Sequence, residues 1–456
     1  MIKRNKFIFA SVMLLSSLAS LASCGGNDTG EVSEVQKVVN EAMTLSREDL
    51  FKKAAEELGD GTMKFIGTSS RFKNAIDSFK EELAKFNPKC ANATITKDST
   101  VDGQIYTKLL AEINSGAKDG YSGALVQDGF QLQKKGLDVK EGQRFINYIP
   151  KEWKEANDTN KDLNGSPFSL QYNMKTWMFN NADGNQKVPD NVWDFTADSF
   201  KGKILTMDPN NENVNMDFLV MLTQDNWCDV LKEAYEDSSN DNKSIDFTKY
   251  AKFGEKQKYA YAFIEKFIQN SAKFGDDGAA RDALTPKTAS GNGAWIVYSK
   301  IASVQETEAV SKKNVTICAF GNDNADGNTA TMKMKGFGGF MYKHYLQVMP
   351  TCPKPWTVCA FINYLSTTAK GYAAWAKDIG DYPSMPSINT DRTKFGHGTL
   401  GADNKFTQKD SDPNVFPALN DPTSKWWEEQ AKVVIEDPAY IAENYYPVKN
   451  FIDGIK

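Results

Sequence analysis

The chain has 456 residues, 25% of them charged, and a formal net charge of −5 at pH 7. A mild negative charge without long blocks of one sign argues against a nucleic-acid surface, whose main source of affinity is a basic face. A chain of this length is long for one hydrophobic core, so two units of ordinary domain size are expected.

The first 24 residues have the pattern of a targeting segment. A basic start is followed by the short apolar stretch Phe7–Leu21, which is too short and too rich in serine for a membrane span. The segment ends Leu21-Ala22-Ser23-Cys24-Gly25, which resembles the lipobox of bacterial lipoproteins. The resemblance implies lipidation of Cys24 and attachment to a membrane surface outside the cytoplasm. The alternative is an ordinary signal peptide with an incidental cysteine. Residues 25–45 are expected to form a tether and a leading helix.

Helices and strands are expected to alternate after this tether. Apolar residues recur at helical spacing up to Leu58, and Ser46 with Asp49 resembles a capping box. Strands are predicted over 63–67 and 121–126, with helices over 72–86 and 102–117. Ligands of open α/β sheets bind at the carboxyl ends of strands. The residues that follow the two strands are therefore candidate ligand contacts: Thr68, Ser69, Ser70, Arg71, Gln127 and Asp128.

The stretch 166–203 has a distinctive order of elements. An extended aromatic run, Phe168–Phe179, is followed by a polar turn, a short segment around Trp193, and a Lys-Gly-Lys sequence before a strand over 204–207. A helix is expected to begin near Val214. The polar residues before it offer side chains and free backbone N–H groups to a ligand. Three of them are candidate contacts: Asn210, Asn211 and Asn213.

The rest of the chain predicts further strands and helices. A loop over 288–299 enters a strand, a second strand covers 315–320, and the glycine-rich segment 334–342 permits unusual backbone conformations. A helix is expected within 354–375. Residues 396–416 are interpreted as a surface loop. Residues 425–455 are expected to be helical and to return to the first unit.

These features together resemble the bacterial extracellular solute-binding proteins of the two-lobed type II kind. In that family a strand ending in Tyr-Asn leaves the first lobe, and a "Trp-Asp … Lys-Gly-Lys" segment starts the second. Tyr172-Asn173, Trp193-Asp194 and Lys201-Gly202-Lys203 hold those places here. The resemblance implies an α/β fold with two lobes and two hinge crossings. Residues 46–168 and 340–456 would form the first lobe and residues 169–339 the second.

The resemblance also implies a function. The chain would be the extracytoplasmic binding component of an ABC importer, holding a small polar solute between its lobes and delivering it to an ABC permease. We expect a monomer without enzymatic activity, cofactor, metal or nucleic-acid partner, attached to the membrane only through its lipid. The resemblance places four further residues at the hinge or near the cleft: Tyr172, Trp295, Tyr298 and Tyr382.

Other interpretations remain open at this stage. The sequence has only two histidines, His344 and His397, and none of the common hydrolase or nucleotide-binding motifs. A surface polysaccharide hydrolase and an adhesin-like lipoprotein without a ligand are the alternative functions. Ser69 could simply cap a helix, and Trp295 could belong to the core.

The nature of the solute is predicted from what the candidate residues offer. In the ferric-binding relatives, adjacent tyrosines commonly coordinate the metal, whereas Tyr298 is followed by Ser299 and the pair Tyr445-Tyr446 lies beyond the second crossing. Hydroxyl groups, amides and Arg71 instead suit a sugar or a small anionic organic compound. Five cysteines follow Cys24, so at least one is unpaired within the chain, and Cys352 and Cys359 could form a disulfide.

Overall fold

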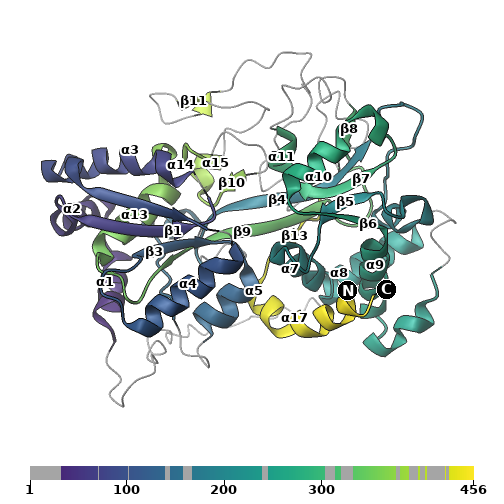
Figure 1. Cartoon of the computed structure of the whole chain (residues 1–456), viewed down its shortest axis with the longest axis horizontal. Coiled ribbons are helices and arrows are strands. Elements are labelled where there is room, and N and C mark those ends of the chain that lie inside the picture. Colours follow the sequence, from purple (N-terminus) through teal and green to yellow (C-terminus); the bar gives the residue numbers. More distant parts are fainter. Residues whose placement is uncertain are drawn as a thin grey trace, which may run out of the picture.

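The computed structural model describes residues 32–69, 71–100, 102–138, 144–157, 167–238, 245–302, 314–319, 332–375, 381–389, 399–400, 406–407, 427 and 431–455. The predictions for Cys24, Ser70 and His397 lie outside these residues. Figure 1 shows two groups of helices and strands, joined across the middle by two long strands, β4 (Ser169–Asn180) and β9 (Gly339–Val348).

The first half of the molecule consists of the elements from α1 to α6 together with α13, α14, β10 and α15. Their bounds are α1 Glu34–Ala42, α2 Arg47–Leu58, β1 Thr62–Gly67, α3 Phe72–Ala84, η1 Pro88–Asn92, β2 Thr94–Ser99, α4 Asp102–Ser115, β3 Gly123–Val126, α5 Gly129–Gln131, η2 Leu132–Leu137, α6 Lys151–Asn157, α13 Pro355–Thr367, α14 Ala369–Tyr372, β10 Asp381–Pro383 and α15 Pro386–Asn389.

The second half consists of the elements between β4 and β9. Their bounds are η5 Val192–Thr196, η6 Asp198–Phe200, β5 Ile204–Met207, α7 Asn213–Met221, α8 Asp225–Glu236, η8 Phe247–Phe253, α9 Gln257–Asn270, β6 Ser271–Phe274, α10 Asp277–Leu284, η9 Lys287–Ala289, β7 Gly293–Val297, α11 Tyr298–Ala302 and β8 Val315–Ile317. The remaining elements are β11 Thr399–Leu400, β12 Phe406–Thr407, β13 Val434–Ile435 and α17 Pro438–Asp453.

One sheet runs through both halves. Its main strand order is β2-β1-β3-β9-β4-β7-β5-β6, with β8, β10 and β13 paired at its middle strands. The outer strands of each half are parallel, as helix-connected strands are, whereas β4 and β9 are antiparallel to each other. The glycine at the start of β9 is required by this pairing, because a Cβ on Gly339 would overlap the carbonyl oxygen of Lys175.

Two buried apolar clusters hold the halves together. The first is built around Phe65, Phe72, Phe79 and Phe361, where rings of α2, α3, α13 and β1 pack edge-to-face or tilted. It continues along one face of β7 under α10. The second cluster lies on the other face of β7, where Trp295 stacks on Phe218 with ring centroids 4.4 Å apart. Aromatic rings therefore provide much of the buried area of both halves.

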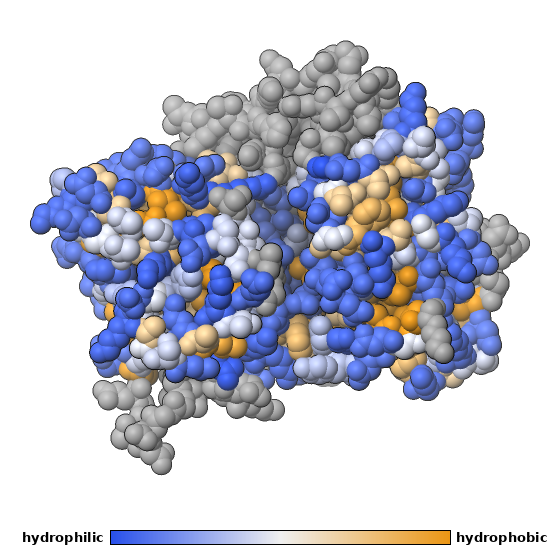
Figure 2. All heavy atoms as spheres, viewed as in Figure 1, coloured by the Kyte–Doolittle hydropathy of each residue, from blue (hydrophilic) through white to orange (hydrophobic). Residues whose placement is uncertain are grey.

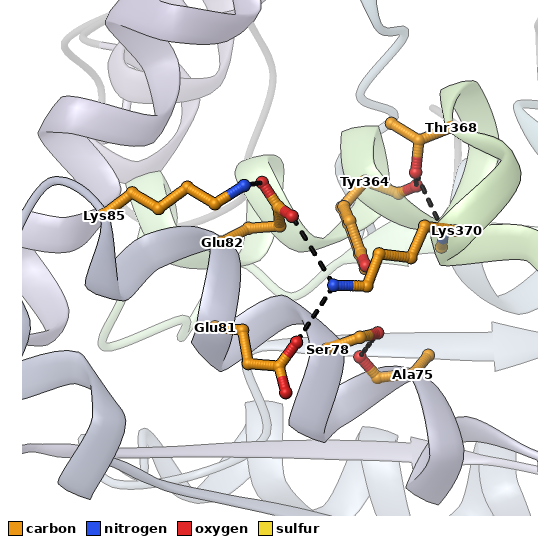
Figure 3. Close-up of polar contacts among 9 residues, drawn as sticks. Ala75, Ser78, Glu81, Glu82, Lys85, Tyr364, Thr368 and Lys370 are labelled. Atoms are coloured by element: carbon orange, nitrogen blue, oxygen red, sulfur yellow. Dashed lines mark hydrogen bonds and ion pairs between the residues drawn. The ribbon is translucent and has the colours of Figure 1, made fainter. Parts of the chain in front are cut away.

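Polar contacts on the surface of the first half join α14 to α3. The ammonium of Lys370 lies 2.9 Å from a carboxylate oxygen of Glu81 and 3.7 Å from one of Glu82 (Figure 3). The hydroxyl of Thr368 caps α14 by accepting the N–H of Gly371, at 2.9 Å. These exposed ion pairs fix orientation more than they add stability.

The C-terminal helix α17, which was expected to return to the first half, contacts both halves. Its buried residues Ile441, Tyr445, Val448 and Ile452 belong to the second core cluster, and it packs against α7 and α9. It also contacts α5 of the first half, where Tyr445 stacks on Phe130 with centroids 3.8 Å apart. The helix thus contacts both halves, because its apolar stripe is wide enough to cover α7 and still reach α5.

The disulfide considered for Cys352 and Cys359 does not form. All five cysteines of the described residues are buried, unpaired thiols. Burial raises the pKa of the Cys352 thiol to about 12, so these sulfurs behave as small apolar side chains.

Candidate functional site

Polar side chains line one face of β4 where it passes between the two halves. Successive strand residues point to opposite faces, so Gln171, Asn173 and Lys175 share one face. All three are buried, and Lys175 is fully buried. Each side chain of this buried polar row requires hydrogen-bond partners.

The neighbouring strands extend this row. In the antiparallel register, Asn173 lies opposite Tyr342 of β9 and Asp381 of β10, and Gln171 lies opposite His344. Directly opposed residues of antiparallel strands face the same side. We call these six residues the polar strip: Gln171, Asn173, Lys175, Tyr342, His344 and Asp381.

The first half supplies partners for one end of the polar strip. The hydroxyl of Tyr372 donates to Oε1 of Gln171 at 2.9 Å, and the amide nitrogen of Gln171 lies 3.1 Å from Nδ1 of His344. Arg71, which precedes α3, donates from Nη1 to Oδ2 of Asp381 at 2.7 Å. The predicted residue Arg71 therefore lies at the strip, with its guanidinium paired to a buried carboxylate.

The second half supplies partners for the other end. The ammonium of Lys175 donates to Oδ1 of Asn215 at 2.9 Å and lies 3.4 Å from a carboxylate oxygen of Asp277. Asn215 is held in turn by its amide, which donates to the carbonyl oxygen of Met207 at 2.8 Å. Burial raises the pKa of the Glu212 carboxyl, directly before α7, while the nearby Lys175 charge acts to lower this pKa and the Asp277 charge to raise it.

Burial and charge together set the protonation of the strip. Burial, and then the nearby Asp277, Glu212 and Asp381 carboxylates, raise the pKa of the Tyr342 phenol well above its usual value. Burial and the Arg71 charge lower the pKa of His344 to about 3. At neutral pH the strip therefore presents a neutral phenol and a neutral imidazole.

Two groups at this site have no hydrogen-bond partner in the described part of the chain. Nε2 of His344 is fully buried and unsatisfied. Glu212 occupies the N-cap position of α7 without capping it, and its carboxylate takes part in none of the hydrogen bonds or ion pairs found among the described residues. Figure 2 shows hydrophilic surface in the recess between the two halves. The arrangement can bind a polar molecule, and it holds no nucleophile paired with a base.

The residues predicted after the strands of the first half lie in different surroundings. Thr68 and Ser69 are half-buried, and Ser69 Oγ accepts the N–H of Arg71 at 3.3 Å. Gln127 is half-buried. Asp128 is fully buried, and the amide of Asn213 donates to its carboxylate, which brings two predicted residues from opposite halves together. Asn210 and Asn211, by contrast, are exposed.

The four predicted aromatic residues are fully enclosed by protein. Trp295 lies in the second core cluster, so its indole offers no flat wall to a solute in this structure. Tyr172, Tyr298 and Tyr382 belong to the first core cluster. The hydroxyl of Tyr382 accepts the indole N–H of Trp427 at 2.7 Å. Tyr172 and Tyr382 face away from the polar strip, because they occupy the alternate positions of β4 and β10. Trp295 lies opposite Trp177, on the same face of the sheet as Lys175 but within the core, and Tyr298 begins α11.

Most of the polar strip was missed by the sequence analysis. The signal was present in the alternation of Gln171, Asn173 and Lys175 within an apolar run, and again in Tyr342 and His344. Partners such as Asp277 and Asp381 gave no signal, because isolated acidic residues are common throughout the chain.

A second buried charged group joins the halves. It consists of Asp128 after β3, Asp217 of α7 and Glu436 after β13, and we call it the carboxylate cluster. Asp217 accepts the N–H of Gly129 at 3.2 Å, and Glu436 accepts the Tyr345 hydroxyl at 2.5 Å. Burial raises the pKa of Glu436 to about 7 and that of Asp217 well above its usual value. Among the described residues, no group of three or more acidic, histidine or cysteine side chains is arranged to hold a metal ion.

Comparison with known proteins rests on solved structures. No family model and no curated protein matches the chain. Iron-bound HitA from Pseudomonas aeruginosa matches with a TM-score of 0.55 and 11% identity, over 86% of this chain and 99% of that one. Apo FutA2 from Synechocystis PCC6803 matches with a TM-score of 0.53 and 12% identity, over 86% and 98%. The PBP AttC from Agrobacterium tumefaciens C58, in an open unliganded conformation, matches with a TM-score of 0.52 and 9% identity, over 87% and 100%.

These likenesses are those of fold, at identities too low to carry a shared ligand. Within the described residues, none of the helices has the length and apolar character needed to cross a membrane. The mixed sheet with two crossing strands agrees with the architecture expected from the sequence. The chain has the two-lobed α/β fold of the type II periplasmic solute-binding proteins.

Proposed function

We propose that the protein is the solute-binding component of an ABC importer and binds its solute at the polar strip. The observation that carries this proposal is the position of the strip between the halves, with partners from both. Arg71 reaches it from the first half, and Asn215 and Asp277 reach it from the second. The unsatisfied Nε2 of His344 and the open carboxylate of Glu212 are groups that a bound solute would satisfy.

The proposal assigns residues 46–168 and 340–456 to one lobe and residues 169–339 to the other. Hinge closure around the solute would then occur at β4 and β9, as in other two-lobed binding proteins. The protein would do no bond chemistry, and the permease would supply the energy of import. The position of α17 across α7 and α5 adds a contact that closure must keep or rearrange.

The solute is proposed to be a small polar organic molecule and not a free ferric ion. Some of the similar structures are of iron-binding proteins, among them iron-bound HitA and the ferric binding protein from Campylobacter jejuni. Across the described ranges of the chain, no group of three or more acidic, histidine or cysteine side chains is arranged to hold a metal ion, and the raised pKa of Tyr342 disfavours the phenolate form of the one phenol of the strip. The amides of Gln171 and Asn173 suit an organic solute better.

The experiment is mass spectrometry of the purified full chain under native conditions, followed by thermal shift with the solute that it identifies. A solute at 100 times its Kd should add about 2.7 kcal/mol to the free energy of unfolding. Tight Fe(III) binding with a tyrosinate charge-transfer colour would contradict the proposed ligand class. Turnover of a surface polysaccharide would favour the hydrolase, and the absence of any solute effect would favour the adhesin.

We further propose that Cys24 carries a lipid that anchors the protein outside the cytoplasm. Replacing Cys24 with Ser removes the thiol that accepts the acyl chain. The Cys24→Ser protein should leave the membrane fraction or remain an unprocessed precursor, as judged by fractionation and intact mass. Full processing together with unchanged membrane association would overturn the anchor.

A further inference from the structure

We propose that the solute carries a protonated amine, held by Glu212 and Asp277 beside Tyr342, and an oxygen acceptor that faces His344. This inference rests on the proposed function, because it assigns the chemistry of the solute to the same polar strip. It differs from the anionic compound considered from the sequence, because the positive charges of the site are already paired with protein carboxylates.

The cations of the site are engaged by protein carboxylates. Arg71 donates to Asp381 at 2.7 Å, in an ion pair whose carboxylate side is only 2% exposed. Lys175 is fully buried and divides its donors between Asn215 and Asp277. An anionic solute would have to compete with these carboxylates, and displacing a buried partner leaves its charge uncompensated.

The carboxylates outnumber the cations around Tyr342. Glu212, Asp277 and Asp381 all lie close enough to act on its phenol, and two cations, Arg71 and Lys175, oppose them. Glu212 is the carboxylate left without a donor among the described residues. A protonated amine would supply both the missing donors and the missing positive charge.

His344 adds a second requirement for the solute. The Tyr372 hydroxyl donates to Oε1 of Gln171, which fixes the Gln171 amide so that its nitrogen faces Nδ1 of His344. A neutral imidazole that accepts at Nδ1 carries its proton on Nε2. That N–H is the buried group without a partner, so the solute should offer it a hydroxyl or carbonyl oxygen.

The test compares solutes that share one skeleton and differ in charge. The probes are glucosamine, glucose and glucuronate, and the shorter set 4-aminobutan-1-ol, butane-1,4-diol and 4-hydroxybutyrate. Each is titrated into the full chain, freed of co-purified solute, by calorimetry at pH 7. We expect the amine of at least one set to bind about tenfold or more tightly than its neutral and anionic counterparts, as a charge-assisted hydrogen bond provides.

Variants locate the preference at Glu212. Glu212→Gln keeps the shape of the side chain and should abolish the tenfold preference. The melting temperature of the free protein should stay nearly unchanged, since the Glu212 side chain makes no hydrogen bond within the part of the chain that the structure describes. Glu233→Gln is the matched control, because it removes the same charge from an exposed position on α8, and it should keep the wild-type preference.

The outcomes separate this inference from the proposed function. Three results would overturn the proposal that the solute carries an amine. They are a preference for a neutral or anionic probe, the failure of every amine to bind, and a preference for the amine that survives in Glu212→Gln. A co-purified solute that lacks an amine would overturn it too, while leaving the solute-binding function intact. If the protein neither retains nor responds to any solute, the proposed function itself fails.

Discussion

The polar strip and the carboxylate cluster are both buried, and both join side chains from the two halves, but they handle charge in different ways. Two carboxylates of the strip's surroundings, Asp381 and Asp277, face Arg71 and Lys175 at 2.7 and 3.4 Å. The hydrogen bonds described for the carboxylate cluster come instead from backbone N–H groups, amides and the Tyr345 hydroxyl.

The difference in charge pairing distinguishes the polar strip, where we propose that the solute binds, from the carboxylate cluster, which joins the two halves. A buried carboxylate beside a cation stays ionised, whereas one without a cation partner takes up a proton more easily. The raised pKa values of Asp217 and Glu436 follow from burial and mutual repulsion. The carboxylate cluster is thus suited to hold α5, α7 and the segment before α17 in place through the hydrogen bonds that its carboxyl groups accept. The strip, where Arg71 and Lys175 lie beside Asp381 and Asp277, is suited to a polar ligand.

Among the substitutions considered, removal of the Lys175 ammonium should have the largest effect on stability. Lys175→Ala leaves Asp277 buried without its cation, so we expect the free energy of unfolding to fall by about 3–5 kcal/mol. Urea denaturation measures this change, with the exposed Lys201→Ala as the control. A loss below about 1 kcal/mol would mean that the strip does not depend on its internal charge balance.

The raised pKa of Glu436 in the carboxylate cluster should make the stability of the protein depend on pH. The folded-state pKa of Glu436 is about 7, above the ordinary 4.5, so the folded protein binds more protons than the unfolded chain between these values. The contribution of Glu436 to stability is therefore present at low pH and falls, by roughly 3 kcal/mol, as the pH rises from 4.5 to 7.

Substitution of Glu436 separates its contribution to the pH dependence of stability from the contribution of His344. The lowered pKa of His344 makes stability rise with pH over part of the same range. We therefore expect the free energy of unfolding of Glu436→Gln, measured by denaturation, to decline less than that of the wild type between pH 4.5 and 8. At pH 8 the variant should be the more stable protein. The exposed Glu443→Gln on α17 should follow the wild-type curve. Parallel curves for Glu436→Gln and wild type would contradict the raised pKa of Glu436.

The smallest effect is expected at the partly exposed end of the strip. Arg71→Ala removes the partner of Asp381, but the Arg71 side chain is 26% exposed, so water can compensate in part. We expect a loss of about 1–2 kcal/mol, and recovery of part of it when Asp381→Asn is added. Additive losses in the double mutant would show that the two side chains do not interact in solution.

The sequence predicted the elements better than the site. Periodicity located β4 within the aromatic run that contains it, but the two faces of that strand could not be told apart without its neighbours. Tyr172 was therefore preferred, although Gln171 and Asn173 face the charged groups. The Arg71–Asp381 pair joins residues 310 positions apart, a separation that no local pattern records. Trp295 looked like a binding surface because aromatic residues serve equally in cores and in clefts.

The central claim is that a solute binds between the two halves and draws them together. Small-angle X-ray scattering of the full chain, freed of solute and then saturated with the molecule that co-purifies with it, tests this claim directly. We predict a smaller radius of gyration with the solute, and no such change with the same solute in Glu212→Gln at a concentration that saturates only the wild type. An identical radius of gyration in the free and saturated wild-type protein would contradict closure around a solute at the polar strip.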